Sequence, residues 1–196
     1  MTKIAICLAL AGLLGCKERA GEPAPAARYQ AVKAQAASTA KWCDSAFAGA
    51  APRLTLPPLA APASGRAQAS LPAGKRVWVN LWATWCAPCL REMPLLLKWR
   101  EDLRKDGVDV DVLLLSLDED ADVFAKFLAE HKEFASAKVG RVAAQRDYEE
   151  WVKAYVKDVA TPIPLHLLAA ADGKARCLRA GSLREGDYPA ARAALR

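Results

Sequence analysis

Apolar and polar positions recur in recognisable periods from Lys75 onward and predict a strand, a helix and a second strand. Residues 77–82 form a β-rich run, and residues 88–105 have a helical pattern that closes at Gly107, a residue suited to the left-handed position after a helix. Residues 108–117 predict the second strand, which becomes largely apolar toward its end, as expected for a strand covered on both faces. These runs predict an α/β core.

Two helices are expected after the second strand. Asp118 and Asp120 can cap the first of them, which continues through Leu128. The second has an apolar face at positions i, i+3, i+4 and i+7 from Tyr148 to Tyr155. This alternation of strands and helices indicates that helices connect parallel strands.

The carboxyl-terminal part predicts an antiparallel hairpin and a closing helix. Residues 165–170 and 174–179 flank Asp172-Gly173, a strong hairpin signal, and a helix is expected over residues 188–195. The predicted order is therefore β-α-β-α-α-β-β-α. The fold class is α/β, with a central mixed β-sheet flanked by helices on both faces.

The amino terminus has the layout of a secretory signal peptide. A positive charge at Lys3 precedes an apolar run, residues 4–14, that is too short to cross a bilayer. The run ends in Leu-Leu-Gly-Cys, which resembles the bacterial lipobox, so we expect cleavage after residue 15 and lipidation of Cys16. A plain cleaved signal with an incidental Cys16 is the alternative. The lipoprotein reading predicts an extracytoplasmic protein held on a membrane surface.

The segment after the signal peptide is rich in alanine and proline and is interpreted as a tether over residues 16–52. A short amphipathic helix around residues 27–47 is expected within it. The folded domain is predicted to span residues 53–196.

Charge and length exclude several classes of function. The chain has 196 residues and a formal charge of +6, and its 28 Lys and Arg alternate with 22 Asp and Glu instead of forming runs. This pattern argues against nucleic acid as a partner. No uninterrupted apolar stretch of 18 residues occurs, so no conventional membrane-spanning helix is expected.

The chemistry is predicted at Cys86-Ala87-Pro88-Cys89, where the first strand meets the helix. Unpaired backbone N–H groups at a helix start stabilise a thiolate, and a cysteine in a C-x-x-C motif there has a pKa of about 3.5–7.5 instead of about 8.5. We expect Cys86 to be an exposed, ionised nucleophile. Cys89, one turn into the helix, is placed to resolve a mixed disulfide. Pro88 suits the first helical turn because its missing N–H is not needed there.

Other interpretations of the pair fit less well. A zinc site needs a second close pair of ligands, whereas Cys43, Cys177, His131 and His166 are isolated in the sequence. A static disulfide would close too short a loop to stabilise much. We therefore predict a redox-active Cys86–Cys89 disulfide, with no other cofactor and no metal.

The stretch VNLWATWCAPCLREMP, residues 79–94, resembles the active-site segment of extracytoplasmic thioredoxin-like reductants of the TlpA/ResA type. The similarity extends from about Arg53 to the carboxyl terminus. It implies a thioredoxin-like fold and a protein-disulfide reductase that draws electrons from a membrane thiol transporter of the DsbD/CcdA type. The clients it implies are disulfide-containing proteins, such as apocytochrome c or copper-site assembly factors.

The resemblance also assigns site residues. Pro164 falls where the family has a cis-proline facing the disulfide, which would present the backbone of Ile163 to a substrate, although Thr161-Pro162 is a competing candidate. Glu92 matches an acidic position that tunes the thiols, with a solvated glutamate favoured by the helix dipole as the alternative.

The same stretch of sequence contains Trp85, Pro88 and Asn80. Trp85, directly before Cys86, is expected to contact substrate and to shield the disulfide. Pro88, between the two cysteines, is also expected to contact substrate. Asn80 replaces the buried acid of cytoplasmic thioredoxins, and an amide cannot accept a proton as a carboxylate does. The acid–base role is therefore expected to fall to Glu92 or water.

Two cysteines and two histidines remain. Cys43 and Cys177 are expected either to form a structural disulfide or to stay as free thiols. A histidine such as His166 or His131 keeps a copper-binding metallochaperone of the same fold as an alternative function, although copper carriers of this fold have three residues between the cysteines and this chain has two. The direction of exchange, whether reducing, oxidising or isomerising, is also left open.

Overall fold

The computed structural model describes residues 41–62, 67–156 and 162–196. Signal peptide, lipidation site Cys16 and most of the predicted tether helix lie outside these ranges. Within them no helix is both long enough and apolar enough to cross a bilayer.

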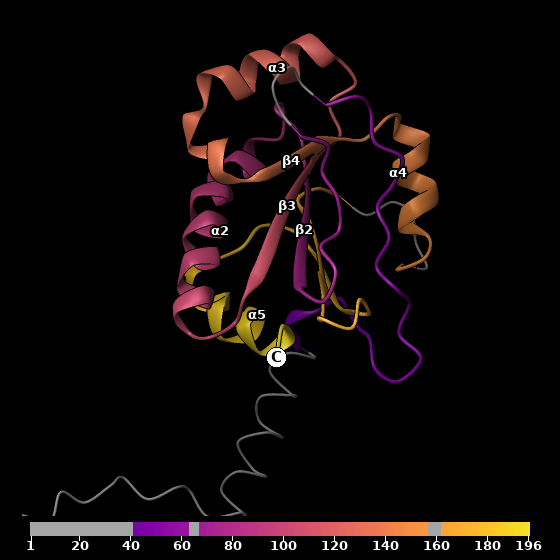
Figure 1. The fold of residues 1–196 in the computed structure, drawn as a ribbon, viewed down its shortest axis with the longest axis vertical. Helices are drawn as coiled ribbons and strands as arrows, with labels where there is room; N and C mark the ends of the chain where they lie inside the picture. Colours follow the sequence, from indigo (N-terminus) through magenta and orange to yellow (C-terminus); the bar gives the residue numbers. More distant parts are fainter. Residues whose placement is uncertain (1–40, 63–66, 157–161) are drawn as a thin grey trace, which may run out of the picture.

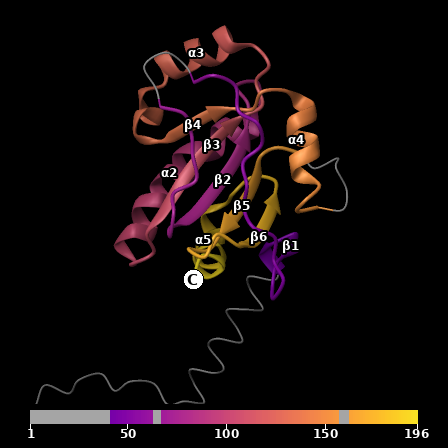
Figure 2. The ribbon, with the colours of Figure 1, turned by 45° about the vertical axis from the view of Figure 1, so that its right-hand side comes forward.

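A single six-stranded mixed sheet forms the centre of the described fold, in the order β1-β6-β5-β2-β3-β4. Figure 2 shows the strands side by side, from β1 at one edge to β4 at the other. β2 pairs in parallel with β3, as the helical crossover predicts, and β5 pairs antiparallel with β6, as the hairpin predicts. β5 also pairs antiparallel with β2, which differs from the expectation that strands joined by helices are parallel. The strands are β1 (Ser45–Ala46), β2 (Arg76–Trp82), β3 (Val110–Ser116), β4 (Lys138–Arg141), β5 (Leu165–Ala169) and β6 (Ala175–Ala180).

Helices cover both faces of the sheet (Figure 1). Along β2, Trp78 and Trp82 pack into one apolar cluster with residues of α2, α3 and α5, whereas Val77, Val79 and Leu81 pack into a second cluster with α4. This alternation follows from the two-residue period of a strand. The helices are α2 (Ala87–Lys105), α3 (Ala121–Glu130), α4 (Gln145–Val152) and α5 (Tyr188–Ala194), with short 3₁₀ turns at Lys132–Ser136 and Glu185–Asp187.

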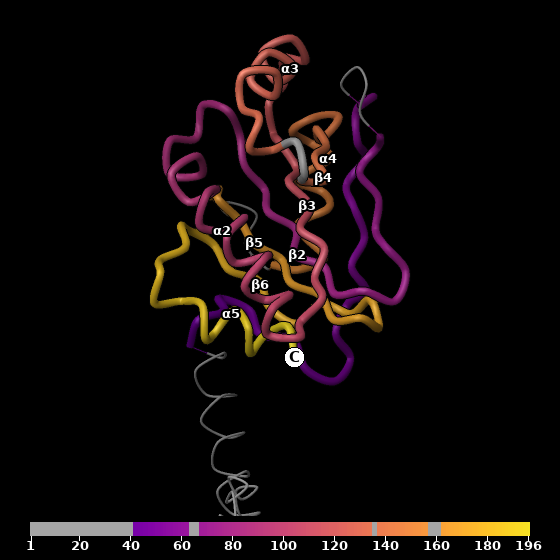
Figure 3. The backbone as a smooth tube through the Cα atoms, turned by 60° about the vertical axis from the view of Figure 1, so that its left-hand side comes forward, coloured from indigo at the N-terminus to yellow at the C-terminus, as the bar shows by residue number. Residues whose placement is uncertain are grey.

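The extended chain before β2 covers part of the α4 face. In Figure 3 this segment runs along the side of the sheet opposite α2. Leu54 and Ala69 are buried in the same cluster as Val79, and Leu59 packs against it. The predicted thioredoxin-like α/β fold is thus confirmed, with both faces of the central strand buried.

The structure differs from the sequence prediction at the amino-terminal side of the domain. Helical backbone at residues 41–42 ends before Cys43, so the predicted helix reaching Phe47 is wrong at its carboxyl end. Instead, Ser45–Ala46 pairs with β6, and Trp42 is buried in the core, upstream of the expected domain start at Arg53. Pairing with a distant edge strand overrides the local amphipathic pattern because tertiary contacts outweigh weak propensity.

A second difference is β4, which the sequence did not reveal. Its four residues carry only one large apolar side chain, Val139, so the two-residue period is too short to recognise. β4 pairs in parallel with β3 and closes the edge of the sheet. Gly140 lies against Ala69, where an added Cβ would come within 3.1 Å of the Ala69 Cβ.

Candidate active site

Cys86 and Cys89 form a disulfide at the start of α2, directly after β2. Their sulfurs are 2.00 Å apart and their Cα atoms 5.3 Å apart. Cys86 is the N-cap residue of α2, and the backbone N–H of Cys89 donates to Cys86 Sγ at 3.3 Å. Backbone N–H groups at a helix start carry partial positive charge, so this placement favours a thiolate at Cys86 once the disulfide opens.

The disulfide is more covered than expected. Cys86 is 4% exposed and Cys89 fully buried, so the expectation of an exposed Cys86 is wrong for this disulfide form, whereas Cys89 is, as expected, the less accessible of the two. The opposite loop contributes to this cover, because the carbonyl oxygen of Ile163 lies 3.9 Å from Cys86 Sγ. Trp85, next to Cys86, is 69% exposed and presents a large apolar side chain beside the site. Pro88 is half-buried in the first turn of α2.

The loop opposite the cysteines contains a cis peptide bond between Ile163 and Pro164. The competing bond, Thr161–Pro162, involves a residue outside the described ranges. Pro164 is buried immediately before β5, and its carbonyl oxygen accepts a hydrogen bond from the N–H of Gly181 at 2.8 Å. The structure therefore brings Ile163 and Pro164 to the disulfide from a segment about 75 residues away in sequence.

Asp118 shapes the loop between β2 and α2. The sequence suggested it as a helix cap, but Asp120 caps α3 by accepting from Asp122 and Val123 N–H groups. Asp118 instead is 3% exposed and accepts from the N–H of Thr84 at 3.0 Å and from its hydroxyl at 2.6 Å. The carboxylate thus anchors the backbone two residues before Cys86.

Replacing Asp118 with asparagine is expected to lower the free energy of unfolding by about 1–3 kcal/mol, because the amide turns an N–H₂ group toward the donors that the carboxylate satisfied. Urea denaturation measures the change. Asp120→Asn is the matched control, since asparagine is as good an N-cap as aspartate and the expected change is near zero. Equal losses in the two variants would contradict this role for Asp118.

A buried polar cluster lies behind the cysteines, formed by Asn80, Glu92, His166 and Trp78. Asn80 Nδ2 donates to Glu92 Oε1 at 3.1 Å, and the Leu183 N–H donates to Glu92 Oε2 at 2.7 Å. Glu92 is only 3% exposed, so the alternative of a solvated glutamate is wrong. Glu92 follows Cys89 by three residues on α2, which places the two on one side of the helix.

His166 belongs to this cluster. The sequence analysis considered His166 only for copper binding and did not predict this position. It is fully buried on β5, directly opposite Asn80 of β2, and its Nε2 lies 3.3 Å from Glu92 Oε1. The predicted hairpin places residue 166 on a strand, but only the pairing of that strand with β2 brings it to Asn80. His131, the other histidine, is the residue after α3. Its ring stacks on Phe127, with the ring centroids 4.0 Å apart, and it is not part of the buried polar cluster.

Cys43 and Cys177 form a second disulfide, with Cα atoms 5.4 Å apart. Cys177 lies on β6 and Cys43 just before β1, so the bridge links the first described residues to the sheet. Both residues are buried in the cluster that also contains Cys86 and Cys89. Over the described ranges, no group of three or more His, Cys, Asp or Glu side chains is arranged to hold a metal ion.

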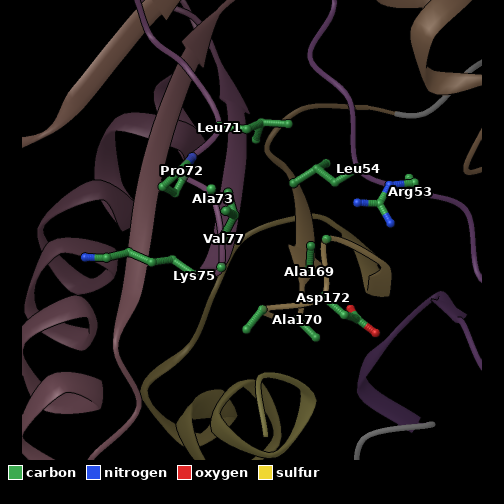
Figure 4. Close-up of a pocket in the computed structure, with 13 residues that line it drawn as sticks. Arg53, Leu54, Leu71, Pro72, Ala73, Lys75, Val77, Ala169, Ala170 and Asp172 are labelled. Carbon is green, nitrogen blue, oxygen red and sulfur yellow. The ribbon is translucent and has the colours of Figure 1, made fainter.

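A cavity of about 290 Å³ lies at the other end of the central strands (Figure 4). It is bordered by Val77 at the start of β2, Ala169 at the end of β5 and the turn that follows, together with Arg53 and Lys75. The cysteines lie instead after the end of β2 and before the start of β5. This cavity is therefore separate from the disulfide site.

Comparison with known proteins agrees with this geometry. Residues 74–164 match the family model described as thioredoxin-like. The thiol-disulfide oxidoreductase ResA of Geobacillus kaustophilus is 46% identical over 37 residues, which cover 19% of this chain and 21% of that protein. ResA of Oceanobacillus iheyensis is 38% identical over 58 residues, 30% of this chain and 29% of that protein. The matches thus span less than a third of these relatives.

Among solved structures, a protein of Chlorobium tepidum described as a DsbE thiol:disulfide interchange protein has a TM-score of 0.49 and 23% identity, over 62% of this chain and 78% of that chain. StoA of Bacillus subtilis has a TM-score of 0.45 and 17% identity, over 60% of this chain and 82% of that chain. The matching family model, the ResA relatives and the C-x-x-C disulfide at a strand–helix junction together show that residues 74–164 of this chain are thioredoxin-like and similar to ResA-type thiol-disulfide oxidoreductases.

Proposed function

We propose that this protein is a thiol-disulfide oxidoreductase that reduces disulfides in client proteins through Cys86 and Cys89. The observation that carries the proposal is the position of Cys86 as N-cap of α2, with the Cys89 N–H directed at its sulfur. That environment stabilises the thiolate, the reactive form in disulfide exchange. The Cys86–Cys89 dithiol is the only redox group that this reaction requires.

The proposed reaction has two exchange steps. The Cys86 thiolate attacks a client disulfide, so that a Cys86–client bond forms, the client bond breaks and one client sulfur leaves as a thiolate. Cys89 then loses its proton and attacks Cys86 Sγ, which forms the Cys86–Cys89 bond and releases the second client sulfur as a thiolate. The client gains two electrons and the dithiol loses two. An external dithiol donor restores the reduced protein by the reverse exchange.

The test is turnover of a model disulfide. With dithiothreitol as donor, the protein is expected to accelerate the reduction of insulin well beyond the rate of dithiothreitol alone. The reduction potential of the Cys86–Cys89 couple then decides the direction. A value near or above about −120 mV, where strong oxidants lie, would replace a reductase with an oxidase or isomerase. Tight Cu(I) binding without insulin reduction would favour the copper metallochaperone.

Glu92 is proposed to accept the proton that Cys89 loses in the second step. It is the buried carboxylate one turn after Cys89, and proton transfer to a positioned side chain contributes about 10²–10⁴-fold to a rate. Glu92→Gln is therefore expected to slow closure of the Cys86–Cys89 bond by about 100-fold, measured by stopped-flow tryptophan fluorescence. Glu101→Gln is the matched control, because Glu101 is a partly exposed residue of the same helix. A similar slowing in both variants would remove Glu92 from this role.

Ile163, Pro164, Trp85 and Pro88 are proposed to form the client-binding surface around Cys86. Ile163 presents its carbonyl oxygen 3.9 Å from Cys86 Sγ, and Trp85 is the most exposed large apolar side chain of the described ranges. A client segment that pairs with the backbone at Ile163 would bring its disulfide to Cys86, while the Trp85 ring supplies apolar contact.

We also propose that the protein works outside the cytoplasm, anchored to a membrane through lipidated Cys16, and receives electrons from a DsbD/CcdA-type transporter. The lipobox-like sequence supports the anchor, and the Cys43–Cys177 disulfide suits an oxidising compartment. Cytochrome c or copper-site maturation factors are the proposed clients. Radiolabelled palmitate should enter the wild type and not Cys16→Ala, and that variant should leave the membrane fraction. Equal labelling would disprove the anchor.

A further inference from the structure

His166 is a buried histidine whose two ring nitrogens face different partners. The indole N–H of Trp78 donates to His166 Nδ1 at 3.2 Å, and Asn80 Nδ2 lies 3.3 Å from the same nitrogen. An indole nitrogen is only ever a donor, so Nδ1 must be the acceptor. A neutral imidazole carries one N–H, which therefore lies on Nε2.

The Nε2 atom faces the carboxylate of Glu92. It is 3.3 Å from Glu92 Oε1, an ion-pair distance, although the alignment is not that of a hydrogen bond and Nε2 has no other partner in the described structure. Glu92 Oε1 also accepts a hydrogen bond from the side-chain amide of Asn80. The Asn80 amide group thus spans His166 and Glu92, and the positive edge of a neutral imidazole is turned toward the carboxylate.

The partners of the two ring nitrogens favour the His166 proton on Nε2 over Nδ1. An Nδ1–H would confront two donors, those of Trp78 and Asn80 on β2. On the neighbouring strand β6, Arg179 is the register partner of His166. The Arg179 guanidinium donates to the Trp42 carbonyl oxygen at 3.3 Å and lies 4.0 Å from an Asp44 carboxylate oxygen. Among the residues that the structure describes, Glu92 of α2 is the acidic group recorded against the ring.

We propose that His166 is a positioning residue of the dithiol site, with its proton on Nε2, so that it orients Glu92 and leaves that carboxylate as the sole acceptor of the Cys89 proton. The inference rests on the proposed function and deepens it. In the closing step the S–H bond of Cys89 breaks, its proton passes to a Glu92 oxygen, and the Cys89 electron pair forms the bond to Cys86 Sγ. His166 neither gains nor loses a proton.

The tautomer is tested by ¹⁵N NMR of the oxidised full-length protein labelled at histidine. The chain contains two histidines, so His131→Gln leaves a single imidazole to assign. We expect His166 to show one pyridine-like nitrogen, Nδ1, and one pyrrole-like nitrogen, Nε2. An imidazolium spectrum, or the proton on Nδ1, overturns the proposal. This readout does not depend on whether the protein reduces any client.

The positioning role is tested by a double-mutant cycle on the rate of Cys86–Cys89 closure. His166→Leu is expected to slow closure by about 10-fold and to change its pH dependence, whereas in a Glu92→Gln background the same substitution should have no further effect. His166→Gln, which retains an N–H donor, should recover part of the rate. If His166→Leu is equally harmful with and without Glu92, the residue is merely structural and the proposal fails. Should His166→Leu not fold, the comparison of His166→Gln in the two backgrounds gives the same decision.

Trp78→Phe removes the indole donor to Nδ1 and is expected to shift the ¹⁵N resonance of Nδ1 in the NMR spectrum. The matched control is Trp82→Phe, since Trp82 is equally buried on the same face of β2 and its indole nitrogen has no partner in the described structure. A spectrum of His166 that is identical in the two variants contradicts the assignment of Nδ1.

Discussion

Replacing Cys86 with serine is expected to abolish insulin reduction, with a loss of about 10³-fold or more, because the variant has no sulfur at the start of α2 to attack a client disulfide. The N-cap position itself is preserved, since serine is a good capping residue. The variant should therefore keep the stability of the reduced wild type while losing its activity. The measurement is insulin turnover with dithiothreitol, together with thermal unfolding of both proteins under reducing conditions.

Cys89→Ser is expected to behave differently, because the nucleophile remains and only the resolving thiol is lost. The variant should accumulate a mixed disulfide between Cys86 and the client, seen as a mass increase that disappears on reduction. Trapping in cells would also identify the client. A mixed disulfide that forms in Cys86→Ser and not in Cys89→Ser would reverse the two roles and contradict the mechanism.

Removing the second disulfide with Cys43→Ala and Cys177→Ala is expected to destabilise the domain by about 2–5 kcal/mol, which lowers Tm by about 4–20 °C for a chain of this size. The two cysteines are 134 residues apart, so the bridge restricts a very long loop of the unfolded chain. Its loss also frees Trp42 and strand β1 from the edge of β6. Differential scanning calorimetry of the oxidised protein measures the shift.

The matched control is the double variant Cys86→Ser and Cys89→Ser, which removes a disulfide that closes a loop with a sequence separation of only 3. Its effect on Tm should be clearly smaller, because the unfolded chain loses little freedom through so short a loop. Insulin reduction by the Cys43 and Cys177 variant should persist at temperatures below its Tm. A larger loss of stability in the control would show that the long bridge contributes little.

Much of this protein was predictable from its sequence, and the reason is that the signals are local. The apolar period of β2, the helix over α2 and the hairpin at Asp172-Gly173 depend on residues close together in the chain. The same holds for Cys86 and Cys89, since a C-x-x-C motif at a strand–helix junction acquires its reactivity from the first turn of its own helix.

Contacts between distant segments decided the rest. Burial of Cys86 depends on Ile163, and the anchoring of Thr84 by Asp118 joins residues 34 apart. The amphipathic pattern before Phe47 predicts a helix, but Ser45–Ala46 forms strand β1 because it can pair with the edge strand β6. That edge exists only in the folded sheet.

The buried cluster shows the difference most clearly. Asn80, Glu92 and His166 lie in three separate elements. The sequence by itself indicated a role for Glu92 and the lack of a buried acid at Asn80, but it did not indicate that His166 lies beside them. The register of β2 with β5 and the packing of α2 on the sheet place them within hydrogen-bonding or ion-pair distance. Because a buried polar group must find its partner in the folded chain, tertiary structure alone decided which of them faces which.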